Sequence, residues 1–340
     1  MANDKSFKIK NGLQAGRYLQ TGGTETAGTE SYRLGSASYD SVSFSAASQD
    51  TTPRGLNFNN DGTKMYILGG TNDTIYQYSL STAFDLSTAS YDSVSFSVSS
   101  QDTTPHDIVF NNDGTKMYVL IFTTDTLYQY SLTTAWDVST ASYDNVSFSF
   151  SSQDSVPYSF TMTPDGTKII MQGNSNFSIF QYSLSTAFDL STISYDNVSL
   201  SAAVDHFSNG RVRFGQNGEK MFMKGGNNVY QYSLSTAYDI STGSYDNVSF
   251  DVSSQVSTPI AFAFDLSGTK MYAVGLGNTK VHQYTLSTAF DISTASYDNV
   301  TLNYASQVSK GGAMTFSQSG HKFYMTSDNT DTVYQYSTGL

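Results

Sequence analysis

The sequence predicts an all-β fold, a six-bladed β-propeller of four-stranded antiparallel blades, preceded by an N-terminal arm. A glycine turn recurs at intervals of 50 or 52 residues, at Gly62, Gly114, Gly166, Gly218, Gly268 and Gly320. A period of roughly 40–50 residues with strand signals is typical of propeller blades. The composition, with 25 Tyr and 22 Phe in 340 residues, favours strands because aromatic side chains suit a half-buried pleated surface.

Each repeat is predicted to form four strands, as the first complete copy illustrates. The first strand, 55–58 ("GLNF"), ends in the turn "NNDGT", where Gly62 permits the positive φ of a tight hairpin. The second strand is 64–68 ("KMYIL") and the third is 74–80 ("TIYQYSL"). A longer segment, "STAFDLSTASYD", leads to the fourth strand at 93–98 ("SVSFSV"). Alternation of Ser with apolar residues there indicates one packed and one wet face.

The two ends of the chain complement each other. Residues 37–50 match the fourth strand of the repeat, but no first, second or third strand precedes them. Residues 332–340 match the third strand, and the chain ends there without a fourth. Pairing these two strands would complete a sixth blade and close the ring, which removes two exposed sheet edges. An open solenoid is the alternative, although it would need polar caps that the sequence lacks. The predicted domains are an arm at 1–31 and a propeller at 32–340.

The repeats resemble those of the YVTN and WD40-like β-propeller families in size and strand order, over about residues 32–340. The repeat sequence, "DGTKMY…YQYSLSTAFDLSTASYD", is similar to that of propeller repeats in marine bacteria and bacteriophages. The Trp-Asp dipeptide of the WD40 family is absent, and Tyr-Gln-Tyr stands where that family closes its third strand.

Comparison of the copies separates two faces of the predicted ring. On one face an aromatic residue and a lysine recur at fixed positions, and we expect structural roles: the aromatics plug adjacent blades and the lysines form a solvated ring. The aromatics are Phe84, Trp136, Phe188, Tyr238 and Phe290, and the lysines are Lys64, Lys116, Lys168, Lys220, Lys270 and Lys322.

On the other face the loops that lead into each first strand differ between copies. Variable loops on a constant scaffold are typical of binding sites, and drift of unconstrained loops is the alternative interpretation. The predicted ligand-binding residues of this rim are Arg54, His106, Asp107, Tyr158, His206, Arg211 and Lys310.

The sequence predicts no catalytic residue, no metal site and no cofactor. Glu occurs only at positions 25, 30 and 219, whereas the six-bladed lactonases that this architecture resembles use Glu with Asn and Asp at the channel mouth. The four His occupy different repeat positions, Cys is absent, and no GxSxG, HExxH or P-loop motif occurs. The turn at Asp61 mimics the start of a calcium-binding EF-hand loop, but the closing acidic position falls on Leu68.

The charge excludes nucleic acid as a partner. The net charge is −12, and phosphate binding needs a basic face. Residues 1–33 carry about +2 and the remaining chain about −14. The sequence has no signal-peptide h-region and no run of about 18 apolar residues, so neither secretion nor membrane insertion is predicted.

The N-terminal arm lies outside the repeats. One interpretation is a disordered tail; the other is an anchor, because "SFKIKNGL" alternates like a strand that could add to the sheet edge of a partner. This phrase resembles the N-terminal anchor "F-x-V-K-N-G-L" of phage tail-fibre and other virion proteins, with Ile9 in place of Val. The resemblance implies docking through Phe7, Ile9 and Leu13.

Together these features predict a non-enzymatic bacteriophage virion structural protein, made in the host cytoplasm and released by lysis. Its arm would dock to other virion proteins, and its propeller would be displayed for attachment to a host-surface polysaccharide or as capsid or tail decoration. We expect a symmetric homo-oligomer or several copies on the particle. The alternatives are a purely structural assembly protein of the head or tail, a lactonase-like bacterial enzyme and a secreted binding protein.

Overall fold

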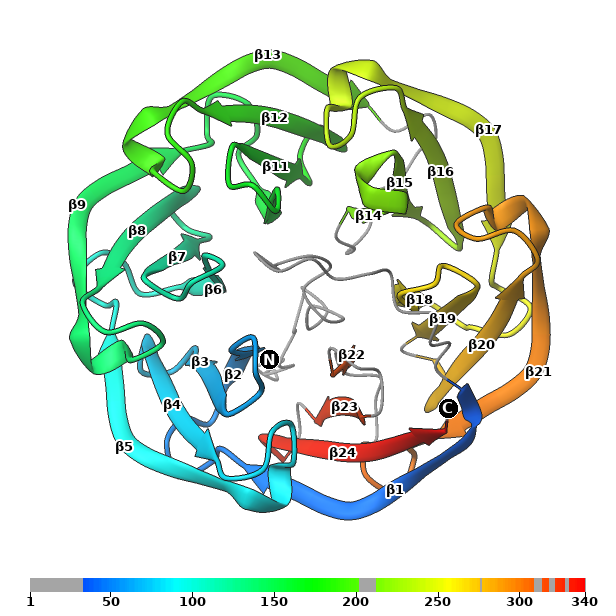
Figure 1. The fold of residues 1–340 in the computed structure, drawn as a ribbon, viewed down its shortest axis with the longest axis horizontal. Helices are drawn as coiled ribbons and strands as arrows, with labels where there is room; N and C mark the ends of the chain where they lie inside the picture. Colours follow the sequence, from blue (N-terminus) through cyan, green and yellow to red (C-terminus); the bar gives the residue numbers. More distant parts are fainter. Residues whose placement is uncertain are drawn as a thin grey trace, which may run out of the picture.

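The structure, a computed structural model, describes residues 33–201, 212–275, 277–308, 314–317, 322–327 and 330–339. These residues form six four-stranded antiparallel sheets, arranged as blades around a centre (Figure 1). The predicted fold class is confirmed. The arm at 1–31, with Phe7, Ile9 and Leu13, lies outside the described residues, so the boundary between arm and propeller stays a prediction.

The blades follow one another along the chain, and the first strand of each lies nearest the centre (Figure 1). Blade 1 contains β2 (Pro53–Phe58), β3 (Lys64–Gly69), β4 (Thr74–Leu80) and β5 (Ala89–Ser97). Blade 2 contains β6 (Pro105–Phe110), β7 (Lys116–Ile121), β8 (Thr126–Leu132) and β9 (Ala141–Ser149). Blade 3 contains β10 (Pro157–Met162), β11 (Lys168–Gly173), β12 (Ser178–Leu184) and β13 (Ile193–Ser201).

Blade 4 contains β14 (Arg213–Gly215), β15 (Lys220–Gly225), β16 (Asn228–Leu234) and β17 (Gly243–Asp251). Blade 5 contains β18 (Pro259–Phe264), β19 (Lys270–Gly275), β20 (Lys280–Leu286) and β21 (Ala295–Asn303). Blade 6 combines β22 (Met314–Phe316), β23 (Lys322–Ser327) and β24 (Thr332–Gly339) with the N-terminal β1 (Arg33–Ser45). Short 3-10 helices are η1 (Leu86–Thr88), η2 (Val138–Thr140), η3 (Leu190–Thr192), η4 (Gln216–Gly218), η5 (Ile240–Thr242) and η6 (Ile292–Thr294).

The segment between the third and fourth strands is more ordered than the sequence predicted. In blade 1 it holds η1, whose first turn is capped by Asp85: the carboxylate accepts a hydrogen bond from the N–H of Ser87 at 3.0 Å. The strand β5 then begins at Ala89, four residues before the predicted start. The prediction was wrong here because a β-bulge interrupts the alternation that marks a strand.

This bulge turns an Asp toward the third strand. In blade 1, Asp92 lies between Tyr91 and Val94, whose partners on β4 are adjacent residues, and a bulge of this kind re-aims a side chain. The Asp92 carboxylate accepts hydrogen bonds from the Gln77 amide at 2.9 Å and the Lys64 ammonium at 2.7 Å. Burial alone would raise the pKa of Asp92, but its hydrogen bonds, led by that from Lys64, hold the pKa below its ordinary value.

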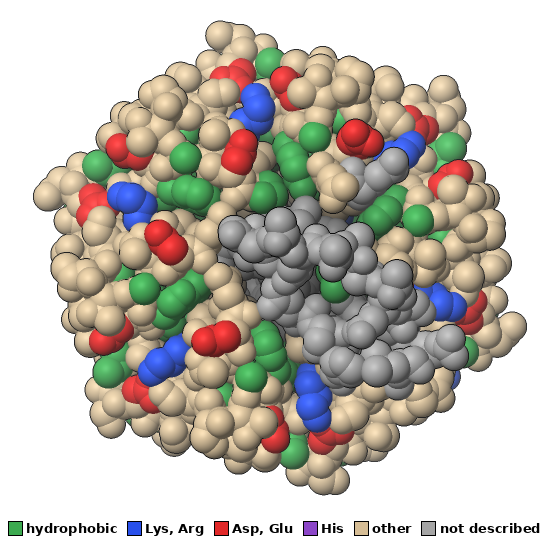
Figure 2. All heavy atoms as spheres, viewed as in Figure 1, with side chains coloured by type: hydrophobic (Ala, Val, Ile, Leu, Met, Phe, Trp, Pro, Cys, Tyr) green, Lys and Arg blue, Asp and Glu red, His purple; other side chains and the backbone are tan. Residues whose placement is uncertain are grey.

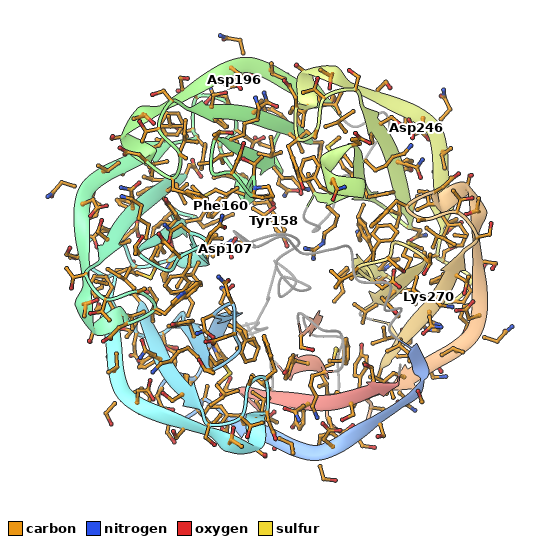
Figure 3. All side chains as sticks on the ribbon, viewed as in Figure 1. Asp107, Tyr158, Phe160, Asp196, Asp246 and Lys270 are labelled. Atoms are coloured by element: carbon orange, nitrogen blue, oxygen red, sulfur yellow. The ribbon has the colours of Figure 1, made fainter. Side chains whose placement is uncertain are left out.

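The lysines are therefore not the solvated ring that we predicted. Each forms an ion pair with the bulge Asp of its own blade and keeps only 17–31% of its side chain exposed. Basic side chains in Figure 2 have acidic neighbours, and Figure 3 labels Lys270, Asp196 and Asp246. The pairs are Lys64–Asp92 (2.7 Å), Lys116–Asp144 (3.6 Å), Lys168–Asp196 (3.9 Å), Lys220–Asp246 (3.0 Å), Lys270–Asp298 (3.1 Å) and Lys322–Asp40 (2.8 Å).

The glutamine of each Tyr-Gln-Tyr joins its blade to the next one. Gln77 Oε1 accepts a hydrogen bond from the N–H of Val138, the first residue of η2 in blade 2, at 2.9 Å. Both residues are buried, so neither group can turn to water instead. The other links join Gln129 to Leu190 (2.7 Å), Gln181 to Ile240 (2.8 Å), Gln231 to Ile292 (2.8 Å), Gln283 to Leu34 (2.8 Å) and Gln335 to Leu86 (2.7 Å). These links run around the whole ring.

The ring closes as the split repeat predicted. The N-terminal β1 pairs antiparallel with β24. Asp40 of β1 acts as the bulge Asp of blade 6: it accepts hydrogen bonds from Lys322, the Gln335 amide and the Ser337 N–H, each at 2.8 Å. Leu34, also on β1, supplies the N–H that Gln283 binds. The first strand of the described chain therefore completes both the sheet and the ring of glutamine links.

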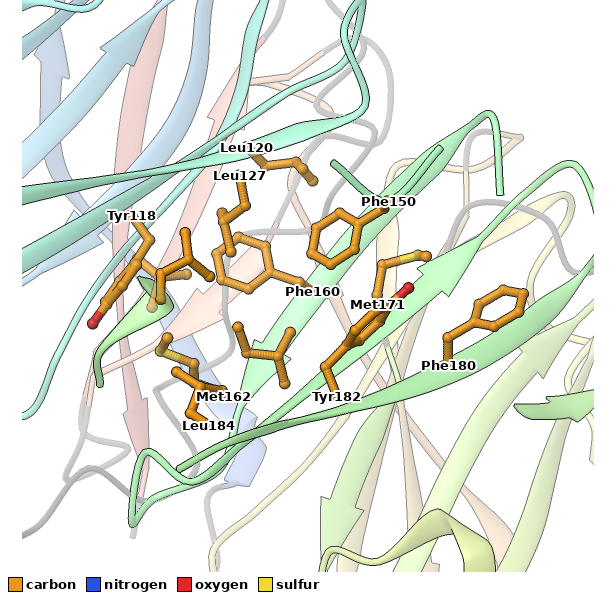
Figure 4. Close-up of a cluster of buried hydrophobic side chains, with 13 residues drawn as sticks. Tyr118, Leu120, Leu127, Phe150, Phe160, Met162, Met171, Phe180, Tyr182 and Leu184 are labelled. Atoms are coloured by element: carbon orange, nitrogen blue, oxygen red, sulfur yellow. The ribbon is translucent and has the colours of Figure 1, made fainter. Parts of the chain in front are cut away.

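The apolar core lies between neighbouring blades. Figure 4 shows one such cluster, in which Tyr118 and Leu120 of blade 2 pack with Phe160, Met162 and Met171 of blade 3. The described residues form six clusters of this kind, and each draws side chains from two adjoining blades. Each blade thus buries apolar surface only because its neighbours are present.

The recurring aromatic residues have structural roles, as predicted. Each ring packs against the glycine turn of its own blade. A Cβ atom added to Gly62, where φ is +72°, would lie 2.3 Å from the Phe84 ring, so the turn needs glycine for space as well as for its backbone. The aromatic residue also helps to join the blades: the Trp136 carbonyl accepts a hydrogen bond from the Tyr66 hydroxyl of blade 1 at 2.6 Å.

One turn of this type carries a buried acid. Asp265 of blade 5 is 0% exposed and occupies the place that Asn59 and Asn111 hold in blades 1 and 2. Its carboxylate accepts hydrogen bonds from the Lys270 N–H at 3.0 Å and the Ser267 hydroxyl at 2.7 Å. Burial raises the pKa of Asp265 even though these hydrogen bonds oppose the rise.

Removing the N-terminal strand should open the ring. We expect the fragment 51–340 to melt more than about 10 °C below the fragment 33–340, because β24 loses its partner and each buried side chain such as Leu34 is worth roughly 1.5–3 kcal/mol. Calorimetry of both fragments measures the difference. Equal melting temperatures would contradict closure of the ring through β1.

Breaking one glutamine link should cost more than a surface change. Gln129→Leu is expected to lower the free energy of unfolding by about 2–4 kcal/mol, because the Leu190 N–H and the Asp144 carboxylate each lose a buried partner. Urea unfolding measures this value. The control Ser147→Ala, on the exposed face of β9 in the same blade, should stay within about 0.5 kcal/mol of the unchanged protein. A link variant as stable as the control would show that the link is dispensable.

Asp265→Asn should stabilise the protein at neutral pH. A raised folded-state pKa means that the charged form costs stability above that pKa, and the cost vanishes as the pH falls below the ordinary value of 3.8. We expect the melting temperature to rise by about one to three degrees at about pH 7 and to be unchanged at about pH 3.

Asp61→Asn is the matched control for this change. Asp61 lies in the corresponding turn of blade 1 and has a lowered pKa: burial would raise it, but hydrogen bonds led by that from Thr63 lower it. Its substitution should therefore reduce stability at about pH 7, and this loss should shrink as the pH falls through the lowered folded-state pKa. A response of the same sign in both variants would contradict the assignment for Asp265.

Candidate functional site

The antiparallel strand order sorts the connections onto two faces of the ring. The uniform face carries the connections between first and second strands and between third and fourth strands, at 59–63 and 81–88 in blade 1. The variable face carries the turns between second and third strands and the loops between blades, at 70–73 and 98–104 for blade 1. The lysine, aspartate and glutamine side chains of the uniform face are engaged in the links between and within blades. The blade-specific residues that the sequence predicts to bind a ligand belong to the variable face.

Blades 1 and 3 share a carboxylate clamp on the variable face. Asp154 accepts hydrogen bonds from the N–H groups of Val156 and Asn176, both at 2.8 Å, and so ties the incoming loop to the turn that follows β11. Asp50 does the same in blade 1. The clamp needs glycine at the end of the second strand, since a Cβ atom on Gly173 would lie 2.3 Å from Asp154 Oδ2.

The clamp is missing from blades 2, 5 and 6. In blade 2 the glycine is replaced by Ile121, and Asp102 instead accepts a hydrogen bond from the Thr123 hydroxyl at 2.9 Å. In blades 5 and 6 the clamp Asp is replaced by Val256 and Val308, both 0% exposed. The variable face therefore differs between blades in its backbone attachments as well as in its side chains.

Three of the predicted binding residues lie on first strands and not in exposed loops. His106 and Asp107 are the second and third residues of β6, and Tyr158 is the second residue of β10. Their exposed fractions are 9%, 5% and 2%, so none of the three is an exposed side chain of the rim. Figure 3 places Asp107 and Tyr158 on the inner side of their blades. Pro105 and Pro157 start these strands earlier than the sequence indicated, so His106 and Tyr158 lie on strands instead of in loops.

The structure brings two of these residues together across a blade boundary. The rings of His106 and Tyr158 lie 5.9 Å apart in an edge-to-face arrangement, and the His106 ring also lies 5.5 Å from that of Phe122. Asp107 Oδ1 accepts a hydrogen bond from the N–H of Ile108 at 3.0 Å. Their role in binding a ligand stays a prediction.

The other predicted binding residues cannot be placed. His206, Arg211 and Lys310 lie outside the described residues, as do the docking residues of the arm. Arg54 lies on β2 at the position that corresponds to His106, but its side chain is outside the described part.

Sequence reasoning missed a second group of polar residues, on the inner strands of blades 3 and 4. Gln172 of β11 is 2% exposed and pairs across the sheet with Ser159 of β10, which is also 2% exposed. Lys224 of β15 is 3% exposed. The signal was present in the repeats, because the same column holds Leu68 in blade 1 and apolar residues in blades 2 and 5.

Lys224 and Gln172 place a buried amine and a buried hydrogen-bond acceptor where other blades have apolar side chains. Burial lowers the pKa of Lys224 to about 8, so its amine is partly uncharged near neutral pH. Within the described residues, Gln172 Oε1 is a buried acceptor to which no donor is hydrogen-bonded. Unpaired buried acceptors are costly. We call His106, Asp107, Tyr158, Ser159, Gln172 and Lys224 the inner polar residues; they belong to blades 2–4.

In the part of the chain that the structure describes, no group of three or more His, Cys, Asp or Glu residues is arranged to hold a metal ion. The described helices are short 3-10 turns, and none has the length and apolar content needed to cross a membrane.

Comparison with known proteins extends only to the fold. No protein-family model matches the sequence, and no curated protein matches it. Among solved structures, the chain is similar to the Cps50 (Swd1) β-propeller domain of Myceliophteria thermophila, with 10% identity, a TM-score of 0.55 and coverage of 84% of this chain and 96% of that one. It is similar to a luciferin-regenerating enzyme, with 13% identity, a TM-score of 0.54 and coverage of 88% and 95%.

A third similar structure is a candidate 6-phosphogluconolactonase from Bacteroides uniformis, with 12% identity, a TM-score of 0.53 and coverage of 74% of this chain and 71% of that one. The chain shares a propeller fold with all three. At such low identities, their different activities do not transfer to it.

Proposed function

We propose that this chain is a non-enzymatic structural protein of a bacteriophage particle that displays its propeller to bind a neutral or mixed-charge saccharide of a host surface. The observation that carries the proposal is the contrast between the two faces. One face repeats the same links in every blade, while the described blades differ from one another on the other face, where blades 2–4 carry the inner polar residues. A constant scaffold with polar groups on one sector is typical of a binding protein.

The chemistry of the variable face favours an uncharged ligand. The inner polar residues include a histidine, an amide, two hydroxyl groups, one acid and one amine, which together offer donors and acceptors without a dominant charge. The chain outside the first 33 residues carries about −14, and such a field repels polyanions. Saccharide hydroxyl groups can both donate to Gln172 Oε1 and accept from other side chains.

The assignment to a phage particle rests on the N-terminal arm. Its phrase "SFKIKNGL" resembles the anchors of virion proteins, and residues 1–33 carry a positive charge that the rest of the chain lacks. An arm of this kind would dock to other virion proteins while the propeller remains free. Identification of the chain by mass spectrometry in purified particles tests this part of the proposal separately.

A lactonase is the competing function, because one similar structure is a candidate 6-phosphogluconolactonase. Metal-dependent lactonases of this architecture require an acidic metal site, whereas the inner polar residues contain a single acid, Asp107. Hydrolysis of a sugar lactone by the full-length protein, dependent on an added divalent metal, would favour the enzyme.

The inner polar residues should be needed for binding and not for folding. We expect the double variant Gln172→Leu, Lys224→Leu to lose at least about tenfold in affinity for a saccharide that the unchanged protein binds on an array of bacterial surface polysaccharides. Both changes install the residue that blades 1 and 2 carry in this column. The melting temperature should stay constant or rise, because buried polar groups are replaced by apolar ones.

The control for this experiment lies on the uniform face of blades 2 and 3. Thr133→Ala, Ser185→Ala replaces two exposed hydroxyl groups there and should leave both saccharide binding and stability unchanged. If the unchanged protein binds no saccharide, or if the inner variant binds as well as the control, the proposed binding function is wrong.

A further inference from the structure

The turn between β11 and β12 presents an aromatic ring to solvent. Phe177 is 41% exposed, and it is the only large hydrophobic side chain in the described part of the molecule that is exposed. It lies on the variable face, in the blade that also contributes Tyr158, Ser159 and Gln172. A single exposed apolar side chain is ordinary on a protein surface, so its backbone and its neighbours decide whether it has a role.

The backbone at this position is unfavourable for phenylalanine. Phe177 has a φ of +50°, the left-handed region that bulky residues rarely adopt. The corresponding residues of blades 1, 2 and 6 are Asp73, Asp125 and Asp331, with φ values of 50°, 52° and 50°. Aspartate tolerates this conformation better than phenylalanine does.

The turn itself requires the left-handed residue. In blade 2 the Asp125 carbonyl accepts a hydrogen bond from the N–H of Phe150 at 2.8 Å, and in blade 1 the Asp73 carbonyl accepts one from Val98 at 2.8 Å. These bonds fasten the turn to the loop that follows the fourth strand. A phenylalanine in such a place is strained and exposed together, a combination that fold stability alone disfavours and that is characteristic of functional positions.

The turn holds this ring on a rigid support. Asp154 binds the N–H groups of Ser175 at 3.1 Å and Asn176 at 2.8 Å, and the Asn176 amide donates to the carbonyl of Gln153 at 2.9 Å. Phe177 therefore follows two residues whose backbone is clamped. An aromatic side chain has only two rotatable bonds, so on a held backbone it loses little conformational entropy when it binds a partner.

Apart from Phe177, the side chains of the turn itself are polar and uncharged. The turn reads Gly-Asn-Ser-Asn-Phe-Ser at 173–178, whereas the turns of blades 1 and 2 carry Asp73 and Asp125. Aromatic rings flanked by amides and hydroxyl groups suit a neutral sugar, whose C–H groups bear a slight positive charge and pack on the electron-rich ring face while its hydroxyl groups exchange hydrogen bonds with Asn and Ser.

We infer that Phe177 is the stacking platform of the saccharide site and that blade 3 is the sector of the variable face that selects a neutral sugar. This inference rests on the proposed function and deepens it. It also replaces Tyr158, which is buried, with an aromatic side chain that a ligand can reach.

Substitution at residue 177 tests the inference on the full-length protein, with an array of dextran, mannan, galactan and other neutral polysaccharides as probes. Phe177→Asp should reduce affinity at least about tenfold for the polysaccharide that the unchanged protein binds. Its melting temperature should stay constant or rise, because Asp is the residue of blades 1, 2 and 6 at this position. Phe177→Trp should retain binding within about threefold, since it preserves an aromatic face.

A fluorescent reporter separates stacking from an indirect effect. Trp136 is the single tryptophan of the chain and lies on the uniform face, where blades 1, 3 and 5 carry phenylalanine. The double variant Trp136→Phe, Phe177→Trp therefore places the only indole at the proposed platform. Its emission should shift to shorter wavelength as the bound polysaccharide is titrated, because a stacked sugar removes water from the ring.

The possible results distinguish this inference from the proposed function. If the unchanged protein binds a neutral polysaccharide but Phe177→Asp binds it equally well, or if the reporter emission does not change, the platform assignment is overturned and the saccharide function stands. If the unchanged protein binds none of the probes, the saccharide function and the platform are both overturned.

Discussion

The fold depends on a glutamine side chain that bridges two blades. An amide group has a donor and an acceptor on one rigid plane. In blade 1 the donor of Gln77 binds Asp92 of its own sheet, and the acceptor binds the Val138 N–H of blade 2. Leucine would leave the Val138 N–H without its acceptor in a dry interior and would remove one of the donors to Asp92, and glutamate would place a second negative charge beside the aspartate. This is a physical reason for the repetition of Tyr-Gln-Tyr.

Other repeated residues support this bridge. The bulge in the fourth strand aims the Asp at the amide, the lysine after the turn balances its charge, and the capped 3-10 helix presents its first N–H to the neighbouring blade. Each of these features lies toward the uniform face. The repeats are nearly identical there because the glutamine, aspartate, lysine and 3-10 helix that link two blades each need the others in place.

The variable face does not form these links between blades. Its residues can therefore differ from one blade to the next. Gln172 and Lys224 occupy an apolar column, and Phe177 occupies a left-handed position that aspartate fills in other blades. The apolar clusters and glutamine links of the ring supply stability that can offset such local costs. Polar and strained residues suited to binding can therefore occupy one sector while the fold is kept. This is the physical basis for assigning different roles to the two faces.

The sequence by itself determined the number of blades, the order of strands and the closure of the ring, because repeat spacing and a split repeat report topology directly. It also contained the polar exceptions in the column of Gln172, visible by aligning the copies. Only the tertiary structure decided that the lysines are paired, that Tyr158 is buried and that Phe177 is exposed. The ion pairs join the second and fourth strands of one blade, 28 residues apart for Lys64 and Asp92. Burial depends on the side chains that neighbouring blades bring together, from residues about 50 positions apart in the chain. Residues at such separations carry no local signal of their contact.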